Sequence, residues 1–315
     1  ENYRLSKNNF QKADYGFALY NTLDYQNNFS EASEYLIKAN RSVYESIKLN
    51  QYNDEEEFKV YKNIFNSKKI TININNEKNY VKTPIFIVGM PRSGSTLIEH
   101  ILSYFNDIEA LGEVDYFYKS IEYCFKDLTL ENLEKKLSNG LSKEQIQIIS
   151  NYYLKLIDSK KFFFTDKMLS NFRFIGFIIQ CFPNAKILFC KRDKLQNCFS
   201  IYANHFGSVP LPWRYDQNLI KKQYELHLDL MTYWIKNFNH NIFEINHEHF
   251  IKSPKTISKK IVEFIGLNWD EKCLNFNSDR SLIKTASVNQ VRVGINNKAG
   301  DEHLIYKKYL PDLFS

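Results

Sequence analysis

Residues 84–96 read PIFIVGMPRSGST, and this stretch decides the fold. The apolar run 85–88 predicts a short buried strand. A turn rich in Gly, Pro and Ser follows, and apolar side chains then recur at helical spacing over 97–105. A strand that runs through such a turn into a helix points several backbone N–H groups and the positive end of the helix at one place. The stretch therefore predicts a phosphate-binding loop within an α/β domain.

The loop differs from the Walker loop of triphosphate-binding proteins at one position. The spacing from Gly89 to Gly94 and Thr96 fits that loop, but Ser95 stands where a Walker loop carries lysine. That lysine contacts the β- and γ-phosphates of a triphosphate. Its absence, together with Arg92 inside the loop, indicates a nucleotide with a smaller anion at its 5′ end.

The composition fits one large α/β domain with a small addition. The 315 residues are 43% hydrophobic, and the net charge of +6 is not gathered in a basic run. This favours an anionic ligand over general nucleic-acid binding, which needs a concentrated basic patch. No stretch reaches the roughly 18 apolar residues of a membrane span, so we expect no transmembrane segment.

The cysteines indicate a reducing compartment. There are five, an odd number without paired spacing, so we expect buried reduced thiols and a cytoplasmic protein. The chain begins at Glu1 rather than Met, which leaves open a leader removed from its start.

The N-terminal part is predicted to be helical over residues 11–66. Apolar residues form one short stripe over 15–19 and another over 32–39, with a turn at 27–30 between them. This pattern resembles a tetratricopeptide-type helix pair, of which about three copies are normally needed for stability. We therefore expect the pair either to pack on the main domain or to end a longer array, and to offer a surface for self-association or another protein.

A polar, Asn-rich segment at 68–82 is the predicted linker. It divides the chain into a helical segment at 1–83 and a main domain at 84–315. In the main domain, helical patterns alternate with short apolar runs, and 131–158 is predicted as a helical insertion. This alternation favours a parallel sheet with right-handed crossovers. The candidate strands are Ile85–Val88, Ile108–Leu111, Phe162–Thr165, Ala185–Cys190 and Asn241–Ile245.

Ionisable residues follow several of these strands. Because ligands gather at the carboxyl ends of parallel strands, we expect these residues to share one site. Glu113 follows the second strand, Lys167 the third, and Arg192 the fourth. A triphosphate hydrolase has an acid for Mg²⁺ at that fourth position, whereas a basic strand end favours direct binding of a second phosphate. Asp193 is expected to cap the next helix, and Ser200 lies about two helical turns further on.

These motifs together resemble the sulfotransferase family. The segment FIVGMPRSGST resembles its 5′-phosphosulfate loop, and the pair Arg192 and Ser200 resembles its 3′-phosphate site. The downstream segments 264–274 and 285–292 extend the match, which covers about residues 84–310. The chain looks most like bacterial tetratricopeptide-fused sulfotransferases, which are related to tyrosylprotein sulfotransferases.

The resemblance implies that 3′-phosphoadenosine-5′-phosphosulfate is the donor, that adenosine 3′,5′-bisphosphate is a product, and that no metal ion takes part. It assigns the 3′-phosphate to Arg192 and Ser200, with Arg292 joining from a loop over the nucleotide. The residues that would hold the 5′-phosphosulfate are Arg92, Ser93, Gly94, Ser95 and Thr96.

The resemblance also implies the catalytic groups. Lys167, with Arg92, would support the bridging oxygen of the leaving group, and Glu113 would take the proton from the acceptor hydroxyl. A structural ion pair would place Glu113 in the same way, so its role as the base stays open. Relatives carry a Tyr-Glu-Asp-like segment where this chain has residues 247–249, which read HEH. A pair of histidines at alternate positions is a poor zinc set, so we expect it to be packing.

Two other functions remain open at this point. A P-loop nucleotide kinase has a similar fold, but the loop lysine and the Walker-B acid are missing. A helical-repeat interaction protein with a non-catalytic nucleotide site is the alternative outside enzymes. The acceptor, whether a protein tyrosine, a sugar or a small alcohol, and the oligomeric state are not indicated by the sequence.

Overall fold

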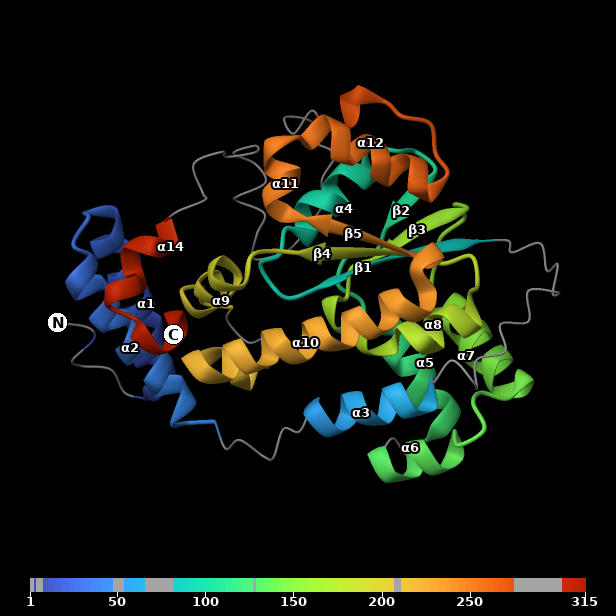
Figure 1. The fold of residues 1–315 in the computed structure, drawn as a ribbon, viewed down its shortest axis with the longest axis horizontal. Coiled ribbons are helices and arrows are strands. Elements are labelled where there is room, and N and C mark those ends of the chain that lie inside the picture. The colour runs from blue at the N-terminus through green and yellow to red at the C-terminus, as the bar shows by residue number, and fades with distance from the viewer. Residues whose placement is uncertain are drawn as a thin grey trace. The chain divides into compact units, whose positions relative to one another are not determined.

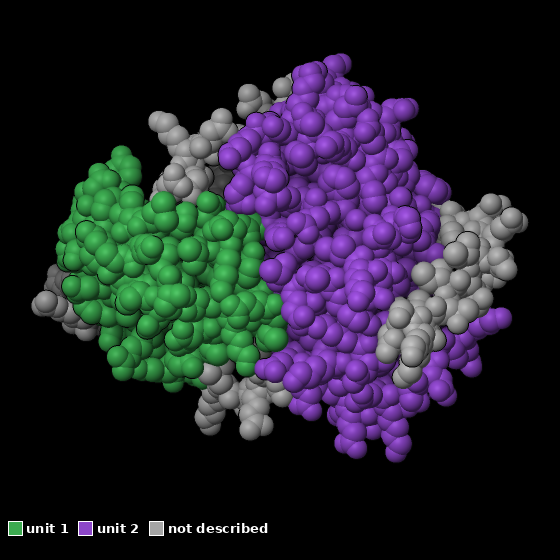
Figure 2. Space-filling model, viewed as in Figure 1, with its two compact units in different colours: residues 1–52, 192–226, 296–315 green, residues 53–191, 227–295 purple. Residues whose placement is uncertain are grey.

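The structure is a computed structural model that describes residues 3, 8–47, 54–65, 82–126, 129–206, 211–274 and 302–315. The chain divides into two compact units (Figure 2). The first comprises residues 1–52, 192–226 and 296–315, and the second comprises residues 53–191 and 227–295. Each unit is thus assembled from separate stretches of sequence, unlike the expected segments 1–83 and 84–315.

The second unit contains a five-stranded, wholly parallel sheet (Figure 1). Its order, β2-β3-β1-β4-β5, puts β1 in the centre with two strands on each side. The carboxyl end of β1 therefore lies where the chain switches sides, which is the usual ligand position in such sheets. All five predicted strands are confirmed: β1 (Thr83–Gly89), β2 (Ile108–Ala110), β3 (Phe163–Asp166), β4 (Lys186–Lys191) and β5 (Ile242–Asn246).

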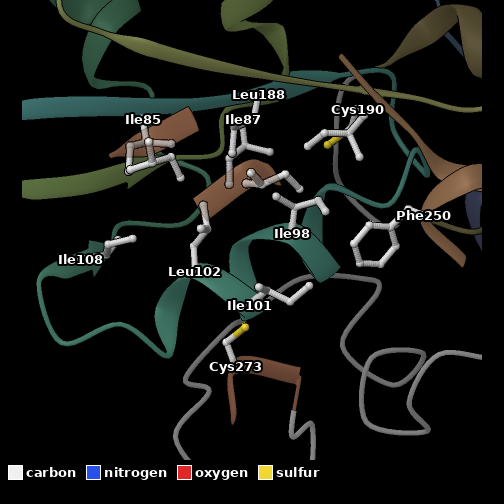
Figure 3. Close-up of a cluster of buried hydrophobic side chains, with 13 residues drawn as sticks. Ile85, Ile87, Ile98, Ile101, Leu102, Ile108, Leu188, Cys190, Phe250 and Cys273 are labelled. Carbon is white, nitrogen blue, oxygen red and sulfur yellow. The ribbon is translucent and has the colours of Figure 1, made fainter. Parts of the chain in front are cut away.

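Aliphatic side chains cover one face of the sheet, where α4 (Ser95–Ser103), α11 (His247–Lys252) and α12 (Pro254–Ile265) lie (Figure 1). Alternate residues of β1 point to opposite faces. Ile85 and Ile87 therefore share this face and join a buried cluster with Ile98 of α4 and Ile261 of α12 (Figure 3). The cluster fixes α4 against the strand from which the phosphate loop emerges.

Aromatic side chains cover the other face, beneath α5 (Tyr116–Phe125), α7 (Lys143–Leu156) and α8 (Ile175–Cys181). The ring of Phe86 lies 5.6 Å from that of Phe117 and 5.8 Å from that of Tyr153, centroid to centroid. The expected helical insertion is present as α6 (Leu130–Lys136) and α7, and the latter begins at a capping box made by Ser142 and Gln145.

Helix α3 (Asp54–Ile64) belongs to this second unit, although the sequence grouped it with the N-terminal helices. Arg173, in the 3₁₀ turn η1 (Leu169–Phe174), donates hydrogen bonds to Asp54 at 2.9 Å and to Glu57 at 2.6 Å. The rings of Phe58 and Phe172 pack edge to face beside this pair of contacts. These contacts attach α3 to the segment that follows β3.

The first unit combines α1 (Asn9–Tyr25) and α2 (Phe29–Tyr44) with α9 (Lys194–Tyr202), α14 (Glu302–Ile305) and α15 (Pro311–Phe314). A Cβ on Gly16 would lie 2.8 Å from that of Ala39, so α1 and α2 pack closely. Buried Asn40 donates to the carbonyl of Tyr202 at 3.1 Å. The predicted N-terminal helix pair is thus present, and its tetratricopeptide character stays a prediction.

The remaining elements include the long helix α10 (Gln217–Phe238) and the 3₁₀ turns η2 (Pro212–Tyr215), η3 (Asn239–Asn241), η4 (Glu271–Leu274) and η5 (Tyr306–Lys308). None of the helices in the described ranges is long and apolar enough to cross a membrane. All five cysteines are free, and all but Cys124 are buried. The predicted linker falls almost wholly on residues outside the described ranges.

Candidate active site at the strand ends

The phosphate loop joins β1 to α4 and needs glycine at both ends. A Cβ on Gly89 would lie 2.4 Å from the carbonyl oxygen of Cys190 on the neighbouring strand. Gly94 has a φ of +93°, and a Cβ there would lie 2.7 Å from Cδ2 of His247. Residues with a side chain rarely adopt that backbone conformation, so the loop's path depends on both glycines.

The loop offers polar groups suited to an anion. Ser95 begins α4, and the first N–H groups of a helix have no acceptor within it. Of these, the Leu97 N–H is already used, because it donates to the Gly94 carbonyl at 3.0 Å. Ser93 is 3% exposed, and its Oγ has no hydrogen-bond partner among the residues described. Arg92 has a φ of +66°, a strained backbone typical of functional sites. The loop therefore fits a phosphate or sulfate group.

His247 lies against this loop. It opens α11, where Asn246 caps the helix by accepting from His249 N–H at 2.8 Å. The two histidines thus lie in a first helical turn rather than at a strand end. The described residues contain no group of three or more His, Cys, Asp or Glu able to hold a metal. The packing of His247 on Gly94 was not predicted, and its only sequence signal is its place directly after β5.

Glu113 and Lys167 meet at the ends of β2 and β3. Lys167 Nζ donates to Glu113 Oε1 at 2.7 Å. Backbone hydrogen bonds bring the two segments together, because Lys167 N–H donates to the Gly112 carbonyl at 2.9 Å and Leu111 N–H donates to that of Thr165 at 3.1 Å. The Lys167 side chain is fully buried, whereas that of Glu113 is 48% exposed. Two of the strand-end residues expected to lie together, Glu113 and Lys167, are thus in direct contact.

A second carboxylate, missed in the sequence, adjoins this pair. Glu99 lies on α4 and is fully buried. Its Oε1 accepts from Thr165 Oγ1 at 3.1 Å and from Gly112 N–H at 3.2 Å. Its Oε2 lies 3.8 Å from Lys167 Nζ. Burial raises the pKa of Glu99, and the Lys167 charge and both hydrogen bonds oppose that rise. The available signal was a charged residue among the buried apolar positions of a helix.

Asp166 fixes the turn that carries Lys167. The buried carboxylate accepts from Tyr153 Oη at 2.9 Å, Asn171 Nδ2 at 3.0 Å and Met168 N–H at 3.1 Å. Burial raises the pKa of Asp166 to about 7. Its partners hold the backbone after β3 and leave the ammonium of Lys167 to the two glutamates.

Two of the residues expected at the 3′-phosphate, Arg192 and Ser200, belong to the first compact unit. Arg192 directly follows β4, and its carbonyl accepts from Tyr224 Oη at 2.6 Å. Asp193 caps α9 as predicted, accepting from Gln196 N–H at 3.0 Å, and Ser200 lies in the last turns of that helix. Arg292 lies outside the described residues. The roles of Arg192, Ser200 and Arg292 at the 3′-phosphate stay predictions.

An uncharacterized protein of Aquifex aeolicus (strain VF5) is 29% identical over 309 residues, which cover 95% of this chain and 40% of that protein. The chain therefore spans less than half the length of this relative.

The solved structures that resemble the chain include two sulfotransferase domains. The sulfotransferase domain from the Synechococcus PCC 7002 olefin synthase matches at a TM-score of 0.51 and 16% identity, covering 72% of this chain and 89% of that one. The sulfotransferase domain from the curacin biosynthetic pathway matches at a TM-score of 0.48 and 14% identity, covering 73% and 98%. The first likeness supports the sulfotransferase fold.

A family model described as "Sulfotransferase family" matches residues 84–271, which is more than half of the chain. The match includes the phosphate loop, both glutamates and Lys167. The chain belongs to the sulfotransferase family.

Proposed function

We propose that this protein transfers a sulfuryl group from 3′-phosphoadenosine-5′-phosphosulfate to a hydroxyl of an acceptor. Family membership supports sulfuryl transfer as the reaction class. One observation carries the assignment to this chain's residues. A phosphate loop without lysine follows β1, and a buried ammonium bonded to a half-exposed carboxylate follows the next two strands of the sheet.

Residues 92–96 would hold the 5′-phosphosulfate through loop N–H groups, the Ser93 hydroxyl and Arg92. The buried Ser93 Oγ, which has no partner among the described residues, supports this fit. Arg192 and Ser200 would hold the 3′-phosphate, with Arg292 joining them. These groups bind anions directly, so no metal ion is assigned to the reaction.

When bound, the donor supplies a sulfuryl group whose S–O bond to phosphate breaks, leaving the electron pair on the phosphate oxygen, while a new S–O bond forms to the acceptor oxygen. Lys167 Nζ and Arg92 stabilise the charge that develops on the leaving oxygen. Fixed donors of this kind are each worth about 10²–10³ in rate. The acceptor's hydroxyl proton moves to a carboxylate oxygen of Glu113.

The unequal exposure of the pair supports these separate roles. A general base must come within hydrogen-bond distance of the proton it removes, and Glu113, 48% exposed, is open to an acceptor. Lys167 is fully buried, and a charge acts more strongly where water is excluded.

Thermal stabilisation by adenosine 3′,5′-bisphosphate, compared with ATP plus Mg²⁺, tests the proposal. At about 100 times its dissociation constant the bisphosphate adds about 2.7 kcal/mol to stability. We expect selective stabilisation by the bisphosphate that is lost in Arg192→Ala. Lys194→Ala is the matched control, because it removes a nearby charge whose contact is a surface pair with Glu225.

The alternatives give different results. Stabilisation by Mg-ATP alone would overturn the proposal and favour a nucleotide kinase. Bisphosphate binding with turnover unaffected by Lys167→Ala and Glu113→Gln would favour an interaction protein with a non-catalytic nucleotide site.

A further inference from the structure

Lys167 has two carboxylates beside it, and they differ in their exposure and in their distance from the ammonium. Glu113 is half-exposed and forms a hydrogen bond of 2.7 Å with the ammonium. Glu99 is fully buried and lies 3.8 Å from the same nitrogen, beyond hydrogen-bond length. The near carboxylate is free to move into solvent, whereas the far one is enclosed by protein.

Glu99 is held by one of its two oxygens. Oε1 accepts from Thr165 and from the Gly112 backbone, so it ties α4 to the residues just before Lys167 and Glu113. Oε2 faces Lys167 and has no hydrogen-bond partner among the described residues. A buried carboxylate oxygen without such a bond is costly to keep. Because Oε2 lies beside the ammonium, it can serve as a second hydrogen-bond acceptor for Lys167.

A carboxylate that receives a proton loses its negative charge. Glu113 therefore holds the Lys167 ammonium less strongly once it has taken the proton of the acceptor hydroxyl. A fully buried ammonium left without a partner carries a large desolvation cost. Glu99 Oε2 is the carboxylate oxygen placed to take over that contact.

We propose that Glu99 is a positioning residue that takes over the Lys167 ammonium when Glu113 turns to the acceptor hydroxyl. The inference rests on the proposed sulfuryl transfer and deepens it. Glu99 keeps Lys167 charged and aimed at the leaving oxygen during the step in which Glu113 receives the proton. It does not itself touch the substrate, because its two oxygens face Thr165, the Gly112 backbone and Lys167.

The charged groups around this contact are Glu113, Lys167 and Asp166. Asp166 directly precedes Lys167 in the chain, yet its carboxylate accepts hydrogen bonds from Tyr153, Asn171 and Met168. Asp166→Asn is therefore a matched control for Glu99→Gln. Both changes replace one oxygen of a fully buried carboxylate with nitrogen. Of the two carboxylates, only that of Glu99 faces the Lys167 ammonium.

The main experiment measures donor turnover against pH for the wild type, Glu99→Gln and Asp166→Asn. In Glu99→Gln we expect kcat to fall about 10- to 100-fold, as when partners that orient other catalytic groups are removed. The KM for the donor stays within a few-fold of the wild type. The alkaline limb of the kcat profile moves to lower pH, because the buried ammonium loses its proton more readily without the second carboxylate. Asp166→Asn keeps the wild-type limb.

A second measurement does not use activity. The melting temperatures of Glu99→Gln, Lys167→Met and the double variant form a cycle, and contacting charges give non-additive effects. We expect the double variant to lose less stability than the sum of the losses in the two single variants. If Glu99→Gln does not fold, Thr165→Val carries the kinetic test, because it removes one bond to Glu99 and keeps its charge. It is expected to lower kcat several-fold with the donor KM unchanged.

The outcomes separate the two proposals. A wild-type protein that neither binds the bisphosphate nor turns over the donor overturns the proposed function. An active wild type with an unmoved alkaline limb in Glu99→Gln, additive melting temperatures, or an unchanged kcat in Thr165→Val overturns the role of Glu99 alone.

Discussion

The loop after β1 and the cluster after β2 and β3, which we propose to serve one site, are built by opposite means. The loop, residues 89–95, is a contiguous turn whose shape depends on glycines and whose binding groups are largely backbone N–H groups and hydroxyls. The cluster joins side chains from three separate elements, Glu99, Glu113 and Lys167, and its function depends on charge and burial. The loop is therefore sensitive to added volume, and the cluster is sensitive to lost charge.

The largest effect is expected from Gly94→Ala in the loop. The new Cβ meets His247 at 2.7 Å, and φ is +93°. Stabilisation by adenosine 3′,5′-bisphosphate in a melting curve should disappear. Gly266→Ala is the matched control, since Gly266 has a φ of +94° and no atom within 4 Å of the added Cβ. It should lower stability by about 1 kcal/mol and keep the bisphosphate effect.

Adding His247→Ala to Gly94→Ala separates the two causes. Recovery of bisphosphate binding in the double variant would assign the effect to the contact with the imidazole. No recovery would assign it to the backbone conformation. A single Gly94→Ala variant that binds like the wild type would contradict the dependence of the loop on this glycine.

The next effect is that of Glu113→Gln in the cluster. Removing a general base typically lowers kcat by about 10²–10⁴. The bisphosphate should bind as in the wild type, because Glu113 is not assigned to nucleotide binding. Stability should change little, because Glu99 remains beside the buried Lys167 ammonium. Kinetics at saturating donor, with a melting curve on the same sample, checks both expectations. Intact turnover would show that the base is another group.

The same contrast explains what was predictable from the sequence. The loop is local, so its residues, the preceding strand and the following helix could be recognised in one short stretch. The rule that parallel strands end at one edge predicted that Glu113 and Lys167 lie near each other, but not that they form a direct contact. Glu99 could not be found in this way, because it sits on a helix and reaches the site only when α4 packs against the sheet.

The compact units were also beyond the sequence pattern. Helices α1 and α2 share a unit with α9, α14 and α15, which are distant in the chain. Helix α3 belongs to the second unit, where Arg173 pairs with its first turn. Periodicity predicts which residues form helices, but it holds no information about which distant partner each helix buries its face against.

The last change is Asp166→Asn, and its expected effect is on the pH dependence of stability. Burial raises the pKa of Asp166 from 3.8 to about 7. Between these pH values the folded protein holds a proton that the unfolded chain releases, so the free energy of unfolding falls as pH rises from about 4 to 7. The fall amounts to at most about 4 kcal/mol. Urea unfolding at intervals across this range should show it in the wild type and a correspondingly weaker slope in Asp166→Asn. Equal slopes in the two proteins would mean that Asp166 is ionised throughout, held by its three hydrogen-bond donors.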